Sequence, residues 1–138
     1  MRDILFKGKR TDNGEWVTGQ LYKRSLYYGD PSVKYYIIVS TEDLGYDQAL
    51  EYYEVIPETV GQFTGYTDGK DKRIFEGDII RGYHPIWSEA VIGLVEYKFD
   101  SFGWYMYEDE NILRHIGNLD DTETIGNIYD NPELWEEL

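Results

Sequence analysis

Cysteine is absent from this 138-residue sequence, and histidine occurs only as His84 and His115. The absence of cysteine excludes disulfides, cysteine-ligated zinc and a thiol nucleophile, and it suits a reducing cytoplasm. Two histidines cannot build a His-rich zinc site without carboxylate help, and neither lies in a spaced ligand motif. The sequence also lacks a signal-like N-terminal run and any apolar segment long enough to span a bilayer. We therefore expect a soluble, cytoplasmic protein with no membrane association.

Basic residues are scarce as well. The 13 Lys and Arg are outnumbered by 27 Asp and Glu, and the formal net charge is −14. The imbalance is greatest in residues 101–138, where Arg114 stands alone against 10 acidic residues. A surface of this sign repels nucleic-acid phosphates and anionic lipids, so we expect no nucleic-acid partner.

Aromatic residues are the abundant class, with 14 Tyr, 5 Phe and 4 Trp. Aromatic and β-branched side chains suit the half-buried surface of a sheet. The length suits one domain, or two small ones that share a core. Short extended runs between turn residues predict strands along the whole chain, over residues 4–9, 15–22, 33–39, 50–56, 90–98, 104–107, 112–116 and 123–129.

Several local patterns refine this prediction. Residues 35–39 are apolar on both faces, which predicts a central strand covered on both sides. Residues 41–48, which are acidic, and residues 83–88 are expected to form loops. Asn13-Gly14 predicts a type I′ hairpin turn, which needs two residues at positive φ. Asn131 before Pro132 predicts the N-cap of a short terminal helix.

Residues 60–81 form the middle of the chain as two extended arms joined by a polar tip at residues 67–71. The second arm enters a strand through Glu76-Gly77-Asp78. We expect Gly77 to take a backbone conformation that other residues tolerate poorly, and Asp78 to accept hydrogen bonds from amides of the turn. The competing interpretation makes Glu76 and Asp78 a catalytic pair. We favour the turn, because it accounts for all three residues together.

Four ordered segments resemble the YopX family of proteins encoded by bacteriophages and prophages: residues 1–10 (MRDILFKGKR), 57–65 (PETVGQFTG), 74–80 (IFEGDII) and 125–134 (IGNIYDNPEL). The sequence departs from the family in the tip, where Lys70-Asp71 replaces a common Asn-Gly turn. The resemblance implies a mainly β fold, with a β-rich part over residues 1–60 and an SH3-like barrel over residues 61–138 that ends in a short helix. The short strands after residue 60 independently suit a small barrel. The resemblance implies no activity, because the function of the family is unknown.

Aromatic residues of the second half supply the main functional hypothesis. Because side chains alternate along a strand, only about half of them can point inward. The others are expected to be exposed or to pack against another subunit, and exposed aromatic residues line peptide grooves in SH3-like domains or stack bases in related barrels. The leading hypothesis is a non-enzymatic protein-binding module without a cofactor, whose partner is a second copy, a host protein or a phage protein. The candidate binding surface comprises Tyr83, Trp87, Trp104, Tyr105 and Tyr107.

The first alternative is a carboxylate enzyme that uses a divalent cation. Its candidate residues are Glu76 and Asp78 with Asp68 and Asp71, since hard cations prefer oxygen ligands. The segment around Asp68 lacks EF-hand spacing, and lysines lie among its acids, so a solvated turn is favoured. Further ligands in this reading would be Asp100 or residues 108–110.

The second alternative is an acidic mimic of DNA that occupies a host DNA-binding protein. Closely spaced carboxylates on one face would be needed to replace the phosphates of B-DNA. Solubility and charged turns are the favoured explanation of the same residues. The acids concerned are Glu108, Asp109, Glu110, Asp120, Asp121, Glu123, Asp130, Glu133, Glu136 and Glu137.

Overall fold

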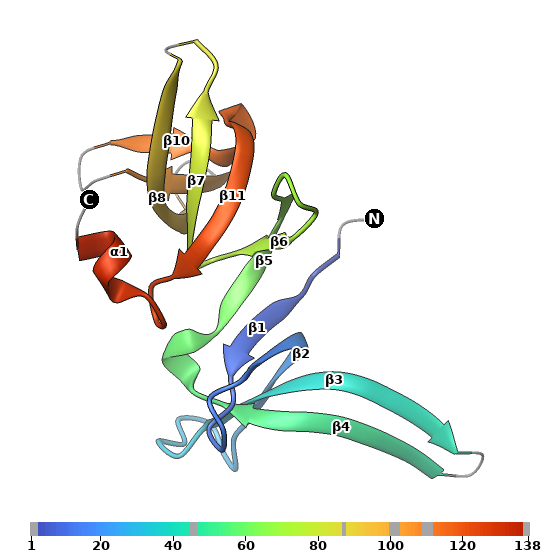
Figure 1. Ribbon diagram of the computed structural model, residues 1–138. Coiled ribbons are helices and arrows are strands. Elements are labelled where there is room, and N and C mark those ends of the chain that lie inside the picture. Colours follow the sequence, from blue (N-terminus) through green and yellow to red (C-terminus); the bar gives the residue numbers. More distant parts are fainter. Residues whose placement is uncertain (1–2, 45–46, 87, 100–102, 109–111, 137–138) are drawn as a thin grey trace. The chain divides into compact units, whose positions relative to one another are not determined.

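The computed structural model describes residues 3–44, 47–86, 88–99, 103–108 and 112–136 (Figure 1). Its strands form two antiparallel sheets, ordered β4-β3-β2-β1-β5-β6 and β10-β9-β8-β7-β11. One short α-helix follows the last strand in the described part of the chain. The predicted mainly β class with a C-terminal helix is confirmed. The chain divides into two compact units, Met1–Gln62 and Phe63–Leu138.

The first unit is a meander of antiparallel strands. It contains β1 (Phe6–Lys9), β2 (Trp16–Arg24), β3 (Lys34–Leu44), β4 (Asp47–Val55) and the first residues of β5 (Gly61–Thr67). β3 lies between β2 and β4, and its core-facing side chain Ile37 is completely buried together with Val55 of β4. A 3₁₀ turn, Pro57–Thr59, leads from β4 into β5.

The acidic stretch that was expected to be a loop is part of a long hairpin. β3 continues to Leu44 and β4 begins at Asp47, with Glu42 opposite Ala49 and Asp43 opposite Gln48. The prediction of a loop is therefore wrong for residues 41–44 and 47–48, and residues 45–46 lie outside the described residues. An antiparallel pair needs only backbone hydrogen bonds to continue, so a polar composition does not by itself end it.

The Asn13-Gly14 turn is also different from the predicted one. Gly14 has a φ of 73°, but Asn13 is not among the residues with positive φ, so the turn is not type I′. Instead, the Gly14 amide donates to the Arg10 carbonyl, and the Asn13 side chain accepts a hydrogen bond from the Glu15 amide. The Asn side chain thus stabilises a longer loop that needs only one residue at positive φ.

The second unit contains a curled five-stranded sheet. Its strands are β7 (Asp78–His84), β8 (Glu89–Lys98), β9 (Gly103–Tyr107), β10 (Leu113–His115) and β11 (Asp120–Asn127). β7 to β10 form a meander, and after a 3₁₀ turn at Ile116–Asn118 the chain returns so that β11 pairs with β7. The predicted SH3-like barrel would have this strand order, and the barrel stays a prediction. No pairing joins β10 to β11 in the described residues, so the sheet is open.

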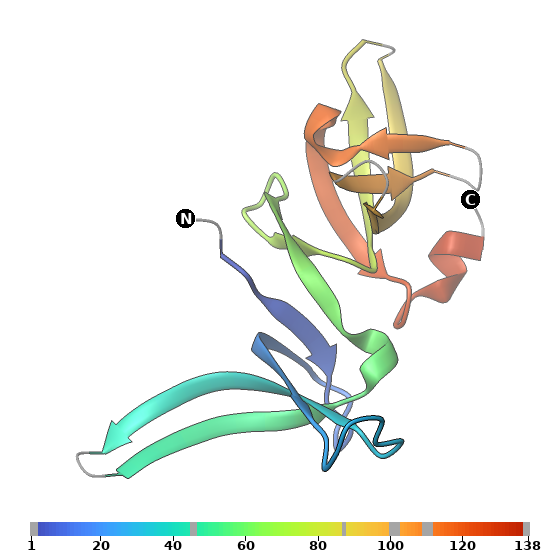
Figure 2. The same cartoon turned by 180° about the vertical axis from the view of Figure 1, so that it is seen from behind.

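The two ends of this sheet cross each other. In Figures 1 and 2, β9 and β10 run across β7 and β8, and this curl encloses a core. β6 (Arg73–Phe75) adds Ile74 to the core, and α1 (Pro132–Glu136) follows β11. The buried cluster consists of Ile74, Ile80, Val91, Val95, Trp104, Met106, Ile116 and Leu119. Tyr83 and His84, expected in a loop, are the last residues of β7 and pair with Ala90 and Glu89. No helix in the described part of the chain combines the length and apolar character needed to cross a bilayer.

Glu76-Gly77-Asp78 forms the turn between β6 and β7. Gly77 has a φ of 90°. Its amide donates a hydrogen bond to the Val95 carbonyl, and its carbonyl accepts one from the Ile128 amide. The Asp78 carboxylate is 2% exposed and accepts a hydrogen bond from the Phe75 amide over 2.8 Å. The three residues thus fix the entry of β7 between its neighbours β8 and β11.

The tip between β5 and β6 is held by Asp68, which is 5% exposed. Its carboxylate accepts hydrogen bonds from the amides of Lys70, Lys72 and Thr124. Burial raises the pKa of Asp68, but the three N–H groups outweigh burial, and the pKa lies below its ordinary value. The carboxylate therefore closes its own turn and fastens it to β11.

We expect Gly77→Ala to destabilise the second unit. A β-carbon there would lie 3.1 Å from Cε2 of Tyr129, in a backbone conformation that costs L-residues about 1–2 kcal/mol. The measurement is urea unfolding of wild type, Gly77→Ala, Tyr129→Ala and the double variant. Gly77→Ala should lower the free energy of unfolding less in the Tyr129→Ala background than in the wild type. An equal loss in both backgrounds would show that crowding against Tyr129 does not contribute.

Asp68→Asn should lower the free energy of unfolding at pH 7 by about 1–3 kcal/mol, because an amide NH₂ replaces an acceptor of buried N–H groups. The lowered folded pKa makes the contribution of Asp68 complete above the unfolded value of about 3.9 and removes it as pH falls through the folded pKa. The difference between wild type and variant should therefore shrink below about pH 4. Chemical unfolding at a series of pH values measures it, and a difference that stays constant down to pH 2 would refute this role.

Candidate functional site

The outer face of the first unit carries a row of exposed aromatic residues. Tyr22 of β2 lies directly opposite Tyr36 of β3, and Tyr52 of β4 lies opposite Ile38. Successive side chains alternate between faces, so this set points away from Ile37 and the core. This strand, β3, was predicted from residues 35–39 to be covered on both sides. The first unit leaves the side of Tyr36 and Ile38 partly exposed.

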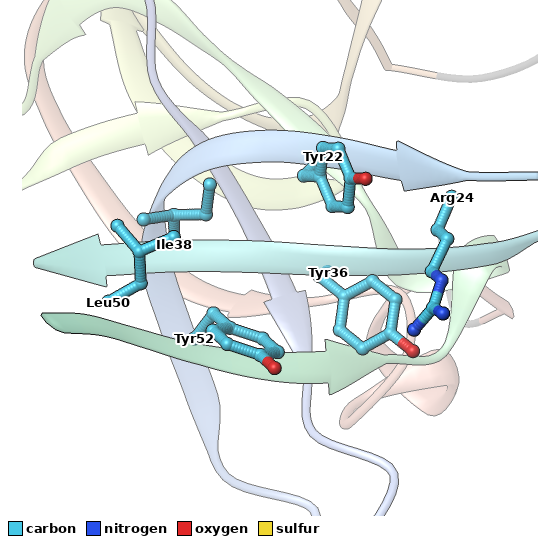
Figure 3. A pocket seen from close by; sticks show the side chains of 6 residues that line it. All are labelled: Tyr22, Arg24, Tyr36, Ile38, Leu50 and Tyr52. Carbon is cyan, nitrogen blue, oxygen red and sulfur yellow. The ribbon is translucent and has the colours of Figure 1, made fainter. Parts of the chain in front are cut away.

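Six residues line a hollow of about 520 Å³ on this face, and we call them the tyrosine face: Tyr22, Arg24, Tyr36, Ile38, Leu50 and Tyr52 (Figure 3). The Tyr36 ring lies at the centre, 6.2 Å from the Tyr22 ring and 5.6 Å from the Tyr52 ring. Tyr22 is 49% exposed, and Leu50 and Tyr52 are each 53% exposed. Cross-strand aromatic pairs of this kind hold one another in place, so the surface is apolar and preformed.

A second hollow adjoins the tyrosine face and shares Arg24 and Tyr36 with it. Its other lining residues are Leu26, Asp30, Ser32 and Lys34. These come from the end of β2, the loop that follows it and the start of β3, so one continuous surface runs from the sheet onto the loop.

Asp30 organises that loop. Its carboxylate is 7% exposed and accepts hydrogen bonds from the Leu26 amide and from the amide and hydroxyl of Ser32. These bonds, led by the one from Leu26, lower the pKa of Asp30. The loop they close presents Tyr27 and Tyr28 to solvent, and Leu26 is 77% exposed. Asp30 therefore shapes the surface, and both of its oxygens are occupied within the loop.

The aromatic residues predicted to form a binding surface in the second unit differ in burial. Trp104 lies in the core and packs edge-on against Tyr97. Tyr105 and Tyr107, which alternate with Trp104 on β9, are half-buried, and the Tyr105 ring lies 5.1 Å from that of His115. Tyr83 is 38% exposed at the end of β7. Trp87 lies outside the described residues.

The predicted acidic residues are partly committed to contacts within the chain. Glu123 pairs with Arg81 at 2.6 Å and Lys70 at 3.2 Å, and these cations lower its pKa. Glu108 accepts a hydrogen bond from Arg114 at 3.0 Å. Asp100, Asp109, Glu110 and Glu137 lie outside the described residues, as does the side chain of Glu136. Within the described part of the chain, no three or more His, Asp or Glu side chains form a group that could hold a metal ion.

Sequence reasoning missed the tyrosine face although the signal was present. Residues 35–39 were recognised as apolar on both sides, but the pattern cannot say whether the chain itself supplies both covers. The partner tyrosines, at positions 22 and 52, face the same side only because of the register between β2, β3 and β4. That register depends on loop lengths and on an irregularity in β3 after Ile38.

These features define a small, mainly β protein in two units, with an aromatic sheet face that the first unit leaves open. A family model described as YopX protein matches residues 6–136, and the chain belongs to the YopX family. The fold is also similar to that in the crystal structure of protein EF1440 from Enterococcus faecalis. That similarity has a TM-score of 0.60 at 20% sequence identity, over 97% of this chain and 99% of the other. No curated protein matches the chain.

Asp30→Ala should loosen the loop at the edge of the tyrosine face without unfolding the sheet. The amides of Leu26 and Ser32 lose their acceptor, so their hydrogen exchange should accelerate, whereas the buried Ile37 amide should stay protected. Exchange measured residue by residue with NMR tests this. Asp12→Ala, which removes an exposed partner of Arg10, is the control and should leave Leu26 and Ser32 unchanged. Unchanged exchange in Asp30→Ala would contradict the proposed loop closure.

Proposed function

We propose that this protein is a non-enzymatic protein-binding module whose contact surface is the tyrosine face. One observation carries the proposal: β3 has apolar side chains on both faces, and of residues 35–39 only Ile37 is buried. The other face presents Tyr22, Leu50 and Tyr52 at about half exposure around a hollow. Apolar patches of this kind on a soluble domain are typical of interaction sites.

The chemistry of the surface supports a protein partner. Tyrosine combines a large apolar ring with a hydroxyl and has few rotatable bonds, so it contributes contact area at low entropic cost. Tyr36 is already held between two other rings, which lowers the ordering cost further. Burying apolar surface stabilises a complex by roughly 25 cal/mol per Å² before association costs are subtracted.

The acidic residues give less support to the two alternatives. A DNA mimic needs unneutralised carboxylates, but Glu123 and Glu108 are paired with cations of the same unit. A carboxylate metal site needs free oxygens, but both oxygens of Asp68 accept backbone hydrogen bonds. We therefore place binding first. The setting we propose is the bacterial cytoplasm, with the protein encoded by a phage or prophage and the partner drawn from the host or the phage.

The double substitution Tyr22→Ser with Tyr52→Ser tests the proposal. Both side chains are half exposed, so the stability cost should be within about 1 kcal/mol and the circular dichroism spectrum should not change. Partner proteins retained from host and phage-infected lysates should be lost from the variant and quantified by mass spectrometry. Tyr83→Ser, a substitution of an exposed tyrosine in the second unit, is the matched control and should keep them. Retention by the double variant, or loss in Tyr83→Ser alone, would overturn the assignment of the surface.

A further inference from the structure

Three of the described arginines pair with a carboxylate and Arg73 lies over the Phe63 ring, whereas Arg24 does neither among the described residues. Arg10, Arg81 and Arg114 each pair with a carboxylate, at 2.6 Å, 2.6 Å and 3.0 Å. Arg24 has no ion pair with any residue that the structure describes, although acidic residues outnumber basic ones about two to one. It lies where the tyrosine face and the adjoining hollow meet, and it lines both.

The adjoining hollow is lined by two cations, Arg24 and Lys34. Nζ of Lys34 lies 3.5 Å from Oε1 of the partly buried Glu54, a contact that contributes little to stability but places a carboxylate beside this ammonium group. Asp30 is its one acidic lining residue, and hydrogen bonds from Leu26 and Ser32 occupy that carboxylate. At this end of the aromatic groove, Arg24 is thus a cation that no carboxylate of the described residues pairs with.

This arrangement fits a ligand that joins an apolar side chain to a carboxylate. A guanidinium binds a carboxylate through two parallel hydrogen bonds, and neighbouring rings that exclude water strengthen the interaction. Tyr22 and Arg24 are two positions apart on β2 and point to the same side. An extended segment places its own side chains i and i+2 on one side with the same spacing of about 7 Å.

We propose that the occupant of the tyrosine face is an acidic extended segment of a partner protein, with an apolar or aromatic residue in the hollow between Tyr22 and Tyr52 and an Asp or Glu two positions away on Arg24. Charge complementarity selects this occupant, and the proposal rests on the binding function proposed above. Arg24 sets specificity for the acid, and the tyrosines supply the apolar contact.

The test begins with a display library of random 12-residue peptides, selected on the wild-type protein and counter-selected on the Tyr22→Ser, Tyr52→Ser variant. Enriched peptides should carry Asp or Glu two positions from an aromatic residue or Leu. A synthetic peptide from the enriched set and its acid-to-amide counterpart are then titrated by fluorescence anisotropy. Wild type should prefer the acidic peptide by about tenfold or more.

Arg24→Gln should remove that preference, so that the acidic and amide peptides bind alike. Lys23→Gln is the matched control, because Lys23 is the preceding residue and lies over Tyr35 on the opposite face. It should leave the preference intact, and added salt should weaken only the acidic peptide on proteins that keep Arg24.

The outcomes separate the two proposals. Peptides that need Tyr22 and Tyr52 but carry no acid, or an acid preference that survives in Arg24→Gln, overturn this inference and leave the binding function in place. A library that yields no peptide dependent on the tyrosines counts against both. A dimer in sedimentation equilibrium that dissociates in the Tyr22→Ser, Tyr52→Ser variant would assign the face to a second copy and overturn the acidic segment as its occupant.

Discussion

A β-strand turns successive side chains to opposite faces of its sheet, so an apolar strand requires cover on both. Within residues 35–39 of β3, only Ile37 is buried, and its neighbours on both faces are partly exposed. On the side of Tyr36, the neighbouring strands contribute Tyr22 and Tyr52, which pack against the Tyr36 ring and are themselves about half exposed. The open tyrosine face follows from this incomplete cover.

Buried carboxylates hold the turns of both units. Asp30, Asp68 and Asp78 are each less than a tenth exposed, and each accepts hydrogen bonds from amides that the sheets leave without partners. In Asp30 and Asp68 these bonds lower the pKa. A large share of acidic residues in a sequence therefore does not translate directly into surface charge, because some of them replace carbonyl groups as backbone acceptors.

The class of fold was accessible from the sequence because it depends on local signals. Strand-forming runs, the Gly77 turn and the helix start after Asn131 are each decided by a few neighbouring residues. The long hairpin was missed, since residues 41–44 continue the ladder by backbone pairing with residues 47–50, and a polar composition does not reveal that register. The tyrosine face was missed for the same reason: Tyr22 and Tyr52 are brought beside Tyr36 by register, which no single segment encodes.

The strand order leaves β4 at the border of its sheet, and only its end is covered in the described residues, where Val55 bridges Arg10 and the Glu54 carbonyl accepts a hydrogen bond from the Thr11 amide. Its sequence places acids at Asp47, Glu51 and Glu54 along this border. Two such borders approaching each other would bring carboxylates of like charge close together. Negative charge along the border strand would thus oppose edge-to-edge pairing of two copies of this sheet.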